Sequence, residues 1–219
     1  MENHKEMIDK FVSKYEEFYN EHGDSSAGVG WFKAEMTDPR FNALTSHIPK
    51  YCGRILDFGC GLGAMYEWMK EKKDPRTYEI EYIGIDITPN HIEVAKQKYP
   101  ECEFFLGDIL SDPTILDKIG FVDYSVLCGV FTMKIDFSDD DMFEFMKNIL
   151  KKVWSSTRIS MSFNLTSDLV DYKKDVLMHV PFDKIAKFVN DELSRNFEIK
   201  AHYGEGYEYS VIVNRIKVD

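Results

Sequence analysis

The chain has 219 residues, of which 44% are hydrophobic and 30% are charged, so long disordered tracts, collagen-like repeats and a coiled coil are excluded. Its 27 Lys and Arg residues against 38 Asp and Glu residues give a net charge of −11. Such a charge repels phosphate backbones, and we therefore expect a small or cationic ligand and no nucleic-acid partner.

The cysteines are scattered along the chain. Cys52, Cys60, Cys102 and Cys128 form no C-x-x-C pair, which argues against a zinc site and a disulfide framework. The first residues carry charges of both signs without an apolar run, and no uncharged stretch is long enough to span a bilayer. We expect a cytoplasmic protein without a membrane partner.

The first fifty residues are predicted to form a helical cap. Hydrophobic residues at helical spacing predict a helix over residues 5–21, and a Gly- and Ser-rich loop follows over residues 22–30. Residues 31–48 are predicted to be a short helical region that is interrupted near Pro39. Residues 51–219 are expected to form the main part of a single compact domain.

Strand-like and helical runs alternate from residue 54 onward. The predicted strands are 55–58, 81–87, 103–106, 121–127 and 157–163, and the predicted helices are 64–72, 89–99 and 142–154. This rhythm predicts βαβ units and a doubly wound, mainly parallel α/β sheet. Two final strand-like runs, 197–203 and 207–214, are joined by three residues, which predicts an antiparallel hairpin with one reversed strand at the end of the sheet.

The segment 55–64 contains the most informative motif. An apolar strand runs into a glycine turn that opens a helix, and Gly59, Gly61 and Ala64 match a G-x-G-x-x-A dinucleotide fingerprint. Asp86 follows 22 residues after Ala64, at the end of the second strand, where a ribose-hydroxyl acceptor is expected. The pattern predicts a cofactor that contains adenosine.

Electrostatics favours one such cofactor. Asp57 lies two residues before the first glycine, where its charge would repel a pyrophosphate by roughly 4 kcal/mol at ~4 Å. S-adenosylmethionine instead carries an ammonium and a sulfonium group. Asp108 ends the third strand and is expected to accept from the adenine amino group, with Ile109 against the ring. A nicotinamide-dependent oxidoreductase is the alternative, but it leaves Asp57 unexplained.

Four ordered motifs carry a family resemblance: D-x-G-x-G-x-G over 57–63, YIGID over 82–86, GDI over 107–109 and VDYSVL over 122–127. They resemble the motifs of class I S-adenosylmethionine-dependent methyltransferases, which implies a Rossmann-like seven-stranded sheet. Residues 22–26, 30–31 and 40–44 resemble the cap of a subgroup that acts on small molecules. The resemblance implies cofactor contacts from Asp57, Gly59, Cys60, Gly61, Gly63, Asp86, Ile87, Asp108, Ile109, Cys128 and Val130.

Two cap residues are further cofactor candidates. Arg40 is hypothesised to pair with the cofactor carboxylate, because arginine suits bidentate carboxylate recognition, and Trp31 to cover the methionine end. The alternative is that Trp31 is a core anchor and Arg40 a surface ion pair. An unchanged cofactor dissociation constant after Arg40→Ala would reject the hypothesis.

Candidate general bases lie in the cap and in the terminal hairpin. They are His22 and Asp24 in the cap, and His202 and Tyr203 in the hairpin, since histidine titrates near neutral pH; the alternative for each histidine is a surface or capping residue. The acceptor pocket is expected between the cap, residues 131–137 and residues 164–182. The acidic triplet 139–141 is explained by a helix N-terminus, and we predict no metal.

The predicted function is methyl transfer from S-adenosylmethionine to an oxygen or nitrogen of a small molecule. The fourth strand is followed by Cys-Gly-Val-Phe over 128–131, not by the Asn/Asp-Pro-Pro-Tyr/Phe pattern associated with base or amide methylation. That departure weakens an RNA methyltransferase reading. The remaining alternatives are an NAD-dependent oxidoreductase and a catalytically silent S-adenosylmethionine-binding subunit.

Overall fold

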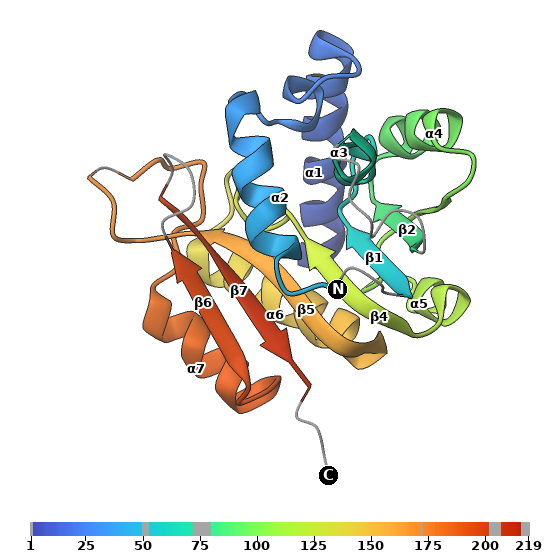
Figure 1. Cartoon of the computed structure of the whole chain (residues 1–219). Helices are drawn as coiled ribbons and strands as arrows, with labels where there is room; N and C mark the ends of the chain where they lie inside the picture. Colours follow the sequence, from blue (N-terminus) through green and yellow to red (C-terminus); the bar gives the residue numbers. More distant parts are fainter. Residues whose placement is uncertain (1, 50–52, 72–79, 172, 202–206, 216–219) are drawn as a thin grey trace.

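The computed structural model describes residues 2–49, 53–71, 80–171, 173–201 and 207–215 (Figure 1). Its centre is a seven-stranded sheet with the order β3-β2-β1-β4-β5-β7-β6. The strands are β1 (Arg54–Phe58), β2 (Glu81–Asp86), β3 (Glu103–Leu106), β4 (Val122–Leu127), β5 (Thr157–Thr166), β6 (Phe197–Ala201) and β7 (Glu208–Asn214). The predicted α/β fold is confirmed, with β1 to β5 parallel along the sheet.

The C-terminal hairpin is confirmed, but its place in the sheet differs from the prediction. β7 is antiparallel to both β5 and β6, and it lies between them, so the reversed strand is one position inside the edge. The burial pattern gives the reason. Five consecutive residues of β7 are buried, as in a strand covered on both faces, whereas β6 keeps exposed residues and forms the edge.

Helices flank both faces of the sheet. They are α1 (Glu2–His22), the 3-10 turns η1 (Ala27–Val29) and η2 (Ala34–Met36), α2 (Thr37–Thr45), α3 (Ala64–Glu71), α4 (Pro89–Lys98), α5 (Thr114–Ile119), α6 (Asp139–Ser156) and α7 (Phe182–Glu192). Pro39 does not interrupt the cap, because it lies in the first turn of α2, where a missing N–H costs nothing. No described helix is long and apolar enough to cross a membrane.

The N-terminus of α6 explains the acidic triplet at 139–141. The Ser138 hydroxyl accepts a hydrogen bond from the Asp141 N–H at 3.1 Å and caps the helix. The three aspartates occupy the first turn, where the helix dipole favours negative charge. Lys134 and Lys184 pair with Asp139 and Asp140.

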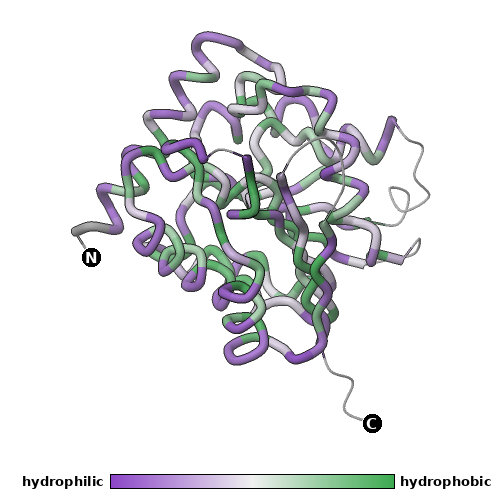
Figure 2. The backbone as a smooth tube through the Cα atoms, turned by 90° about the vertical axis from the view of Figure 1, so that its left-hand side faces the viewer, coloured by the Kyte–Doolittle hydropathy of each residue, from purple (hydrophilic) through white to green (hydrophobic). Residues whose placement is uncertain are grey.

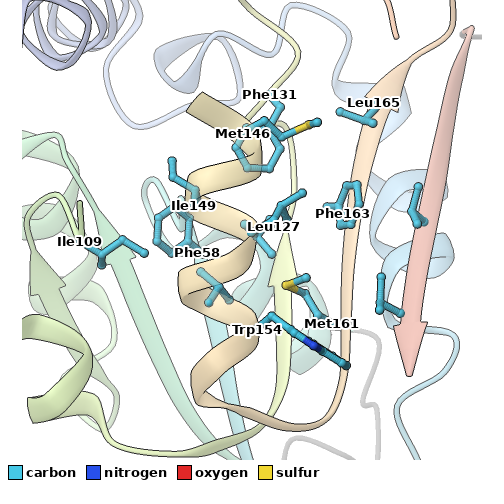
Figure 3. Packing of buried hydrophobic residues seen from close by; sticks show 14 of the residues in the cluster. Phe58, Ile109, Leu127, Phe131, Met146, Ile149, Trp154, Met161, Phe163 and Leu165 are labelled. Carbon is cyan, nitrogen blue, oxygen red and sulfur yellow. The ribbon is translucent and has the colours of Figure 1, made fainter. Parts of the chain in front are cut away.

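Two hydrophobic cores form because alternate strand residues point to opposite faces. In β1, Leu56 and Phe58 enter the core beneath α1, α5, α6 and α7, whereas Ile55 enters the core beneath α2, α3 and α4. Figure 3 shows side chains of α6 pointing toward the sheet in the first core. Figure 2 shows hydrophilic residues along the outer helical turns and hydrophobic ones concentrated on the strands.

The helical segment predicted as a cap packs into both cores. Met7 and Phe11 of α1 belong to the first core, and Phe41 and Leu44 of α2 belong to the second. The Ser162 hydroxyl of β5 donates a 2.7 Å hydrogen bond to the Leu44 carbonyl. These contacts hold α1 and α2 against the rest of the domain, near the end of the sheet at which the parallel strands finish (Figure 1).

Candidate cofactor site

A cavity lies at the carboxyl ends of β1, β2 and β4, where parallel α/β sheets bind their ligands. The glycine turn after β1 forms its floor, and three residues of α1, namely Ile8, Phe11 and Tyr15, line it from the opposite side. The rest of the lining is mostly apolar and comes from Val29, Trp31, Phe41, Met65, residues 85–87, His91, residues 107–108, residues 128–130, Phe145 and Ile149. The cavity is therefore covered by the N-terminal helix.

The glycine turn is fixed by β2. Gly59 and Gly61 have φ values of 78° and 52°, a region that residues with a Cβ rarely adopt. The N–H groups of Gly59 and Cys60 donate to the Ile85 carbonyl at 2.8 and 3.0 Å. One Asp86 carboxylate oxygen accepts from the Gly61 N–H at 2.9 Å, and the other accepts from the Thr88 N–H at 2.8 Å. Asp86 thus holds the turn while facing the cavity.

Asp86 is ionised in its buried position. Burial by itself would raise the pKa of this carboxyl group, but His91 and the N–H groups of Thr88 and Gly61 outweigh that effect and leave the pKa below its usual value. The His91 Nδ1 atom lies 3.8 Å from an Asp86 oxygen, and its ring contacts the rings of Tyr15 and Tyr19 edge-on. An ionised, cavity-facing carboxylate can accept hydrogen bonds from sugar hydroxyls.

Asp57 shows the opposite shift. Its side chain is 3% exposed, and the Tyr82 hydroxyl donates a short hydrogen bond to it. Burial raises the pKa of Asp57 to about 7, the Tyr82 hydrogen bond opposes the rise, and the charge of Asp86 adds to it. The described residues supply Asp57 with a hydroxyl donor but no Lys or Arg partner. A cationic ligand group would complete this site.

Asp108 lies at the end of the cavity beyond β3. Its carboxylate contacts the His4 Nε2 atom at 2.6 Å and accepts from the Ser111 hydroxyl at 2.6 Å and the Leu110 N–H at 3.0 Å. Burial would raise the pKa of Asp108, but these hydrogen bonds hold it below its usual value. His4 therefore joins the first turn of α1 to the third carboxylate.

The cap residues Trp31 and Arg40 lie together, but only Trp31 lines the cavity. The Arg40 guanidinium lies 4.9 Å from the Trp31 ring, and its Nε atom donates to a Glu208 carboxylate oxygen at 2.8 Å. Glu208 also accepts from the Asn164 amide at 2.9 Å, and the Asn164 oxygen accepts from the Gly129 N–H at 2.7 Å. The position of Arg40 does not support its predicted role at the cofactor carboxylate.

Most of the predicted cofactor residues line the cavity, namely Trp31, Asp57, Gly59, Cys60, Gly61, Asp86, Ile87, Asp108, Cys128 and Val130. Three do not. Arg40 pairs with Glu208, Gly63 lies against the Tyr99 ring, and Ile109 is fully buried in the first core near Phe58 (Figure 3). Ile109 lies in the turn after β3, where its side chain packs into the first core and not into the cavity.

Of the predicted bases, His22 and Asp24 lie within the described residues. His22 ends α1, packs edge-on against the Phe32 ring at 5.8 Å and does not line the cavity. His202 and Tyr203 lie outside the described residues. The lining residues that were not predicted from the sequence include Ile8, Phe11 and Tyr15, for which the hydrophobic stripe of α1 was the only signal, and His91 of α4, for which the sequence offered none.

Comparisons with known proteins agree with this geometry. Residues 55–153 match the family model described as "Methyltransferase domain". A "Putative methyltransferase" of Mycobacterium tuberculosis is 25% identical over 164 residues, which cover 74% of this chain and 92% of that protein.

Two solved structures share the fold. Magnesium protoporphyrin IX methyltransferase from Synechocystis PCC 6803 with bound S-adenosylmethionine has a TM-score of 0.61 and 16% identity, covering 94% of this chain and 93% of that one. Human N-acetylserotonin methyltransferase in complex with S-adenosylmethionine has a TM-score of 0.63 and 14% identity, covering 92% of this chain and 58% of that one.

The chain has the fold of these methyltransferases, and its glycine turn and three strand-end carboxylates line the cavity. Residues 55–153 match a methyltransferase domain, and the chain shares the fold of methyltransferases that were solved with bound S-adenosylmethionine. These matches favour S-adenosylmethionine over a nicotinamide cofactor.

Proposed function

We propose that this enzyme methylates an oxygen or nitrogen of a small organic acceptor. The observation that carries the proposal is the cavity itself. It is apolar, it is covered by α1, and its wall at the β4 end is formed by Trp31, Phe41 and Val130. A site covered in this way suits a small molecule, and the net charge of −11 disfavours a polyanion. The names of the two solved relatives, which refer to a porphyrin and to N-acetylserotonin, support the same class.

The carboxylates are proposed to hold the cofactor along the sheet edge. Asp57 pairs with the methionine ammonium, Asp86 accepts from the ribose hydroxyls, and Asp108 accepts from the adenine amino group. The residues around them are chemically suited to this arrangement, because the buried Asp57 carboxylate lacks a cationic partner among the described residues. Bound S-adenosylmethionine supplies a methyl group that its sulfonium has already activated.

The protein contributes placement and exclusion of water. Trp31, Phe41 and Val130 would hold the acceptor in line with the methyl group, and α1 would keep bulk water from the cavity. A hydroxyl acceptor also needs a base to take its proton. His202 and Tyr203 are the proposed bases, and the absence of His22 from the cavity lining favours them over it.

The test is a methyl-transfer assay with radiolabelled S-adenosylmethionine against small phenols, carboxylic acids and amines, with total RNA as a separate arm. We expect transfer to at least one small-molecule class and none to RNA. Calorimetry with S-adenosylhomocysteine and NAD is run in parallel. Labelled RNA would overturn the proposed acceptor class, and S-adenosylhomocysteine binding without any transfer would support a silent subunit.

A further inference from the structure

A buried hydroxyl contact joins β2 to β1 behind the cofactor cavity. Tyr82 is 2% exposed and does not line the cavity, yet its hydroxyl donates to the Asp57 carboxylate, which does. The strand register explains the contact. Asp57 pairs with Gly84, two residues after Tyr82 on the same face, so a long side chain can reach diagonally along the sheet.

The surroundings of Tyr82 leave its hydroxyl little freedom. The centroids of the Tyr66 and Phe104 rings lie 5.0 and 6.2 Å from that of Tyr82. A Cβ at Gly84 would lie 2.5 Å from Phe104 and 2.8 Å from the Cys60 sulfur, so no side chain can stand beside Asp57 at that position. Packed rings therefore aim a single donor at a single carboxylate.

We propose that Tyr82 is a positioning residue that holds Asp57 toward the cavity and keeps it ionised for the ammonium group of the cofactor. The proposal rests on the proposed role of Asp57. Tyr82 itself touches neither cofactor nor acceptor, because Asp57 lies between it and the cavity.

The other titratable groups around Asp57 do not favour its ionised form, so the hydrogen bond from the Tyr82 hydroxyl is important for keeping it ionised. The titratable groups that face it are Tyr82 and Asp86 of β2, Cys60 of the glycine turn and Cys128 at the end of β4. Burial raises the pKa of both thiols, so they stay neutral, and Asp86 disfavours a second negative charge. Burial also holds the pKa of Tyr82 well above its usual value, so its hydroxyl remains a donor.

The experiment is calorimetric titration with S-adenosylhomocysteine between pH 6 and 8.5. In the unaltered enzyme, affinity is expected to rise with pH around a midpoint near 7, because Asp57 becomes ionised. Tyr82→Phe removes the donor and is expected to raise the midpoint by about one pH unit. Affinity at pH 7 then falls about fivefold, and the difference shrinks below about twofold at pH 8.5.

The matched control is Tyr66→Phe. It removes a hydroxyl that donates to Glu101 at 3.0 Å, from a ring packed on that of Tyr82, and is expected to leave the midpoint unchanged. Equal loss of affinity at every pH in Tyr82→Phe would show a merely structural role and overturn the proposal. A flat profile in the unaltered enzyme would contradict the role of Asp57 as well, so the two failures are distinguishable.

A second measurement covers the case in which Tyr82→Phe does not fold. Biosynthetic replacement of the tyrosines by 3-fluorotyrosine keeps the packing and makes each hydroxyl a stronger donor. The midpoint is then expected to move to lower pH. An unchanged midpoint with intact binding would overturn the proposal.

Discussion

Asp57 and Asp86 are 29 residues apart in sequence, face the same cavity and have opposite pKa shifts. The difference lies in their donors. Asp86 accepts from two backbone N–H groups and lies beside His91, whereas Asp57 accepts from one hydroxyl. Near neutral pH the enzyme thus holds one permanently ionised carboxylate and one that is close to its titration midpoint.

The raised pKa of Asp57 has a consequence for stability. Since the folded-state pKa of about 7 lies above the usual 3.8, folding favours the protonated form, and this stability is lost as the pH rises from about 4 through 7. Asp57→Asn cannot ionise. In ligand-free protein we expect it to gain on the order of 3 kcal/mol relative to the unaltered enzyme at pH 8, and little at pH 4.5.

Urea unfolding at the two pH values measures this gain. Asp117→Asn, at an exposed position of α5, is the control and should show the same small difference at both pH values. Asp57→Asn should at the same time weaken S-adenosylhomocysteine binding. A variant that is equally destabilised at pH 4.5 and 8 would contradict the raised pKa.

The three carboxylates were predictable from sequence, but their partners were not. Asp57, Asp86 and Asp108 follow or end apolar strands, and parallel strands bring such positions to one edge. Tyr82 reaches Asp57 only through the register of β1 with β2. His4 reaches Asp108 across 104 residues, and no local pattern encodes where α1 will dock.

At the scale of elements, α1 is the cover of the cofactor site. Its residues Ile8, Phe11 and Tyr15 line the cavity, and the His4–Asp108 contact fastens its first turn. We expect His4→Ala to raise the dissociation rate of S-adenosylhomocysteine about fivefold, because one charge-assisted hydrogen bond of roughly 1 kcal/mol closes this end.

Stopped-flow fluorescence of Trp31, which lines the cavity, reports the dissociation rate. Lys14→Ala is the control, since Lys14 pairs with Glu17 on the exposed side of the same helix and should leave the rate unchanged. Equal rates in His4→Ala and the unaltered enzyme would show that the first turn of α1 does not retain the ligand.

The ion pair of Arg40 with Glu208 joins α2 to β7. Both side chains are largely buried, at 15% and 11% exposure, so removing one partner leaves a poorly solvated charge. We expect Arg40→Ala to lower the free energy of unfolding by about 1–3 kcal/mol and to change S-adenosylhomocysteine affinity less than about twofold.

A double-mutant cycle with Glu208→Gln tests the pair, and a coupling free energy of about 1 kcal/mol or more is expected in urea unfolding. Glu81→Gln, at the exposed pair with Arg54, is the control and should cost little. A large loss of cofactor affinity in Arg40→Ala with unchanged stability would instead support the hypothesis that Arg40 pairs with the cofactor carboxylate.

Two helices, α5 and α7, were not predicted from the sequence, and the reasons differ. α5 has only six residues, too few for a periodic pattern to stand out. α7 does carry the pattern, with Ile185, Phe188 and Val189 buried at helical spacing, and it begins at Phe182, where the segment 164–182 that was assigned to the acceptor pocket ends. The long strands and helices before residue 157 were predicted to within a few residues because their hydrophobic periods are strong.

At the scale of the whole molecule, the cofactor site draws on the cap, the glycine turn and four strand ends at once. A ligand bound there should therefore stabilise the entire fold. At 100 times its dissociation constant, S-adenosylhomocysteine is expected to add about 2.7 kcal/mol, which corresponds to a rise in Tm of roughly 5–10 °C.

Thermal unfolding with and without the ligand measures the shift. NAD at the same concentration should leave Tm unchanged, because its pyrophosphate would face the partly ionised Asp57. A larger shift with NAD than with S-adenosylhomocysteine would contradict the cofactor assignment.

The position of α1 over the cavity has a consequence for the order in which the substrates bind and the products leave. Ile8, Phe11 and Tyr15 line the cavity opposite the glycine turn, so we expect that the cofactor binds before the acceptor and leaves after the methylated product. Steady-state kinetics should accordingly follow a compulsory sequence in which the methyl donor arrives first and the spent nucleoside leaves last. Release of the demethylated nucleoside would then limit turnover, and that nucleoside would inhibit the enzyme in competition with the methyl donor.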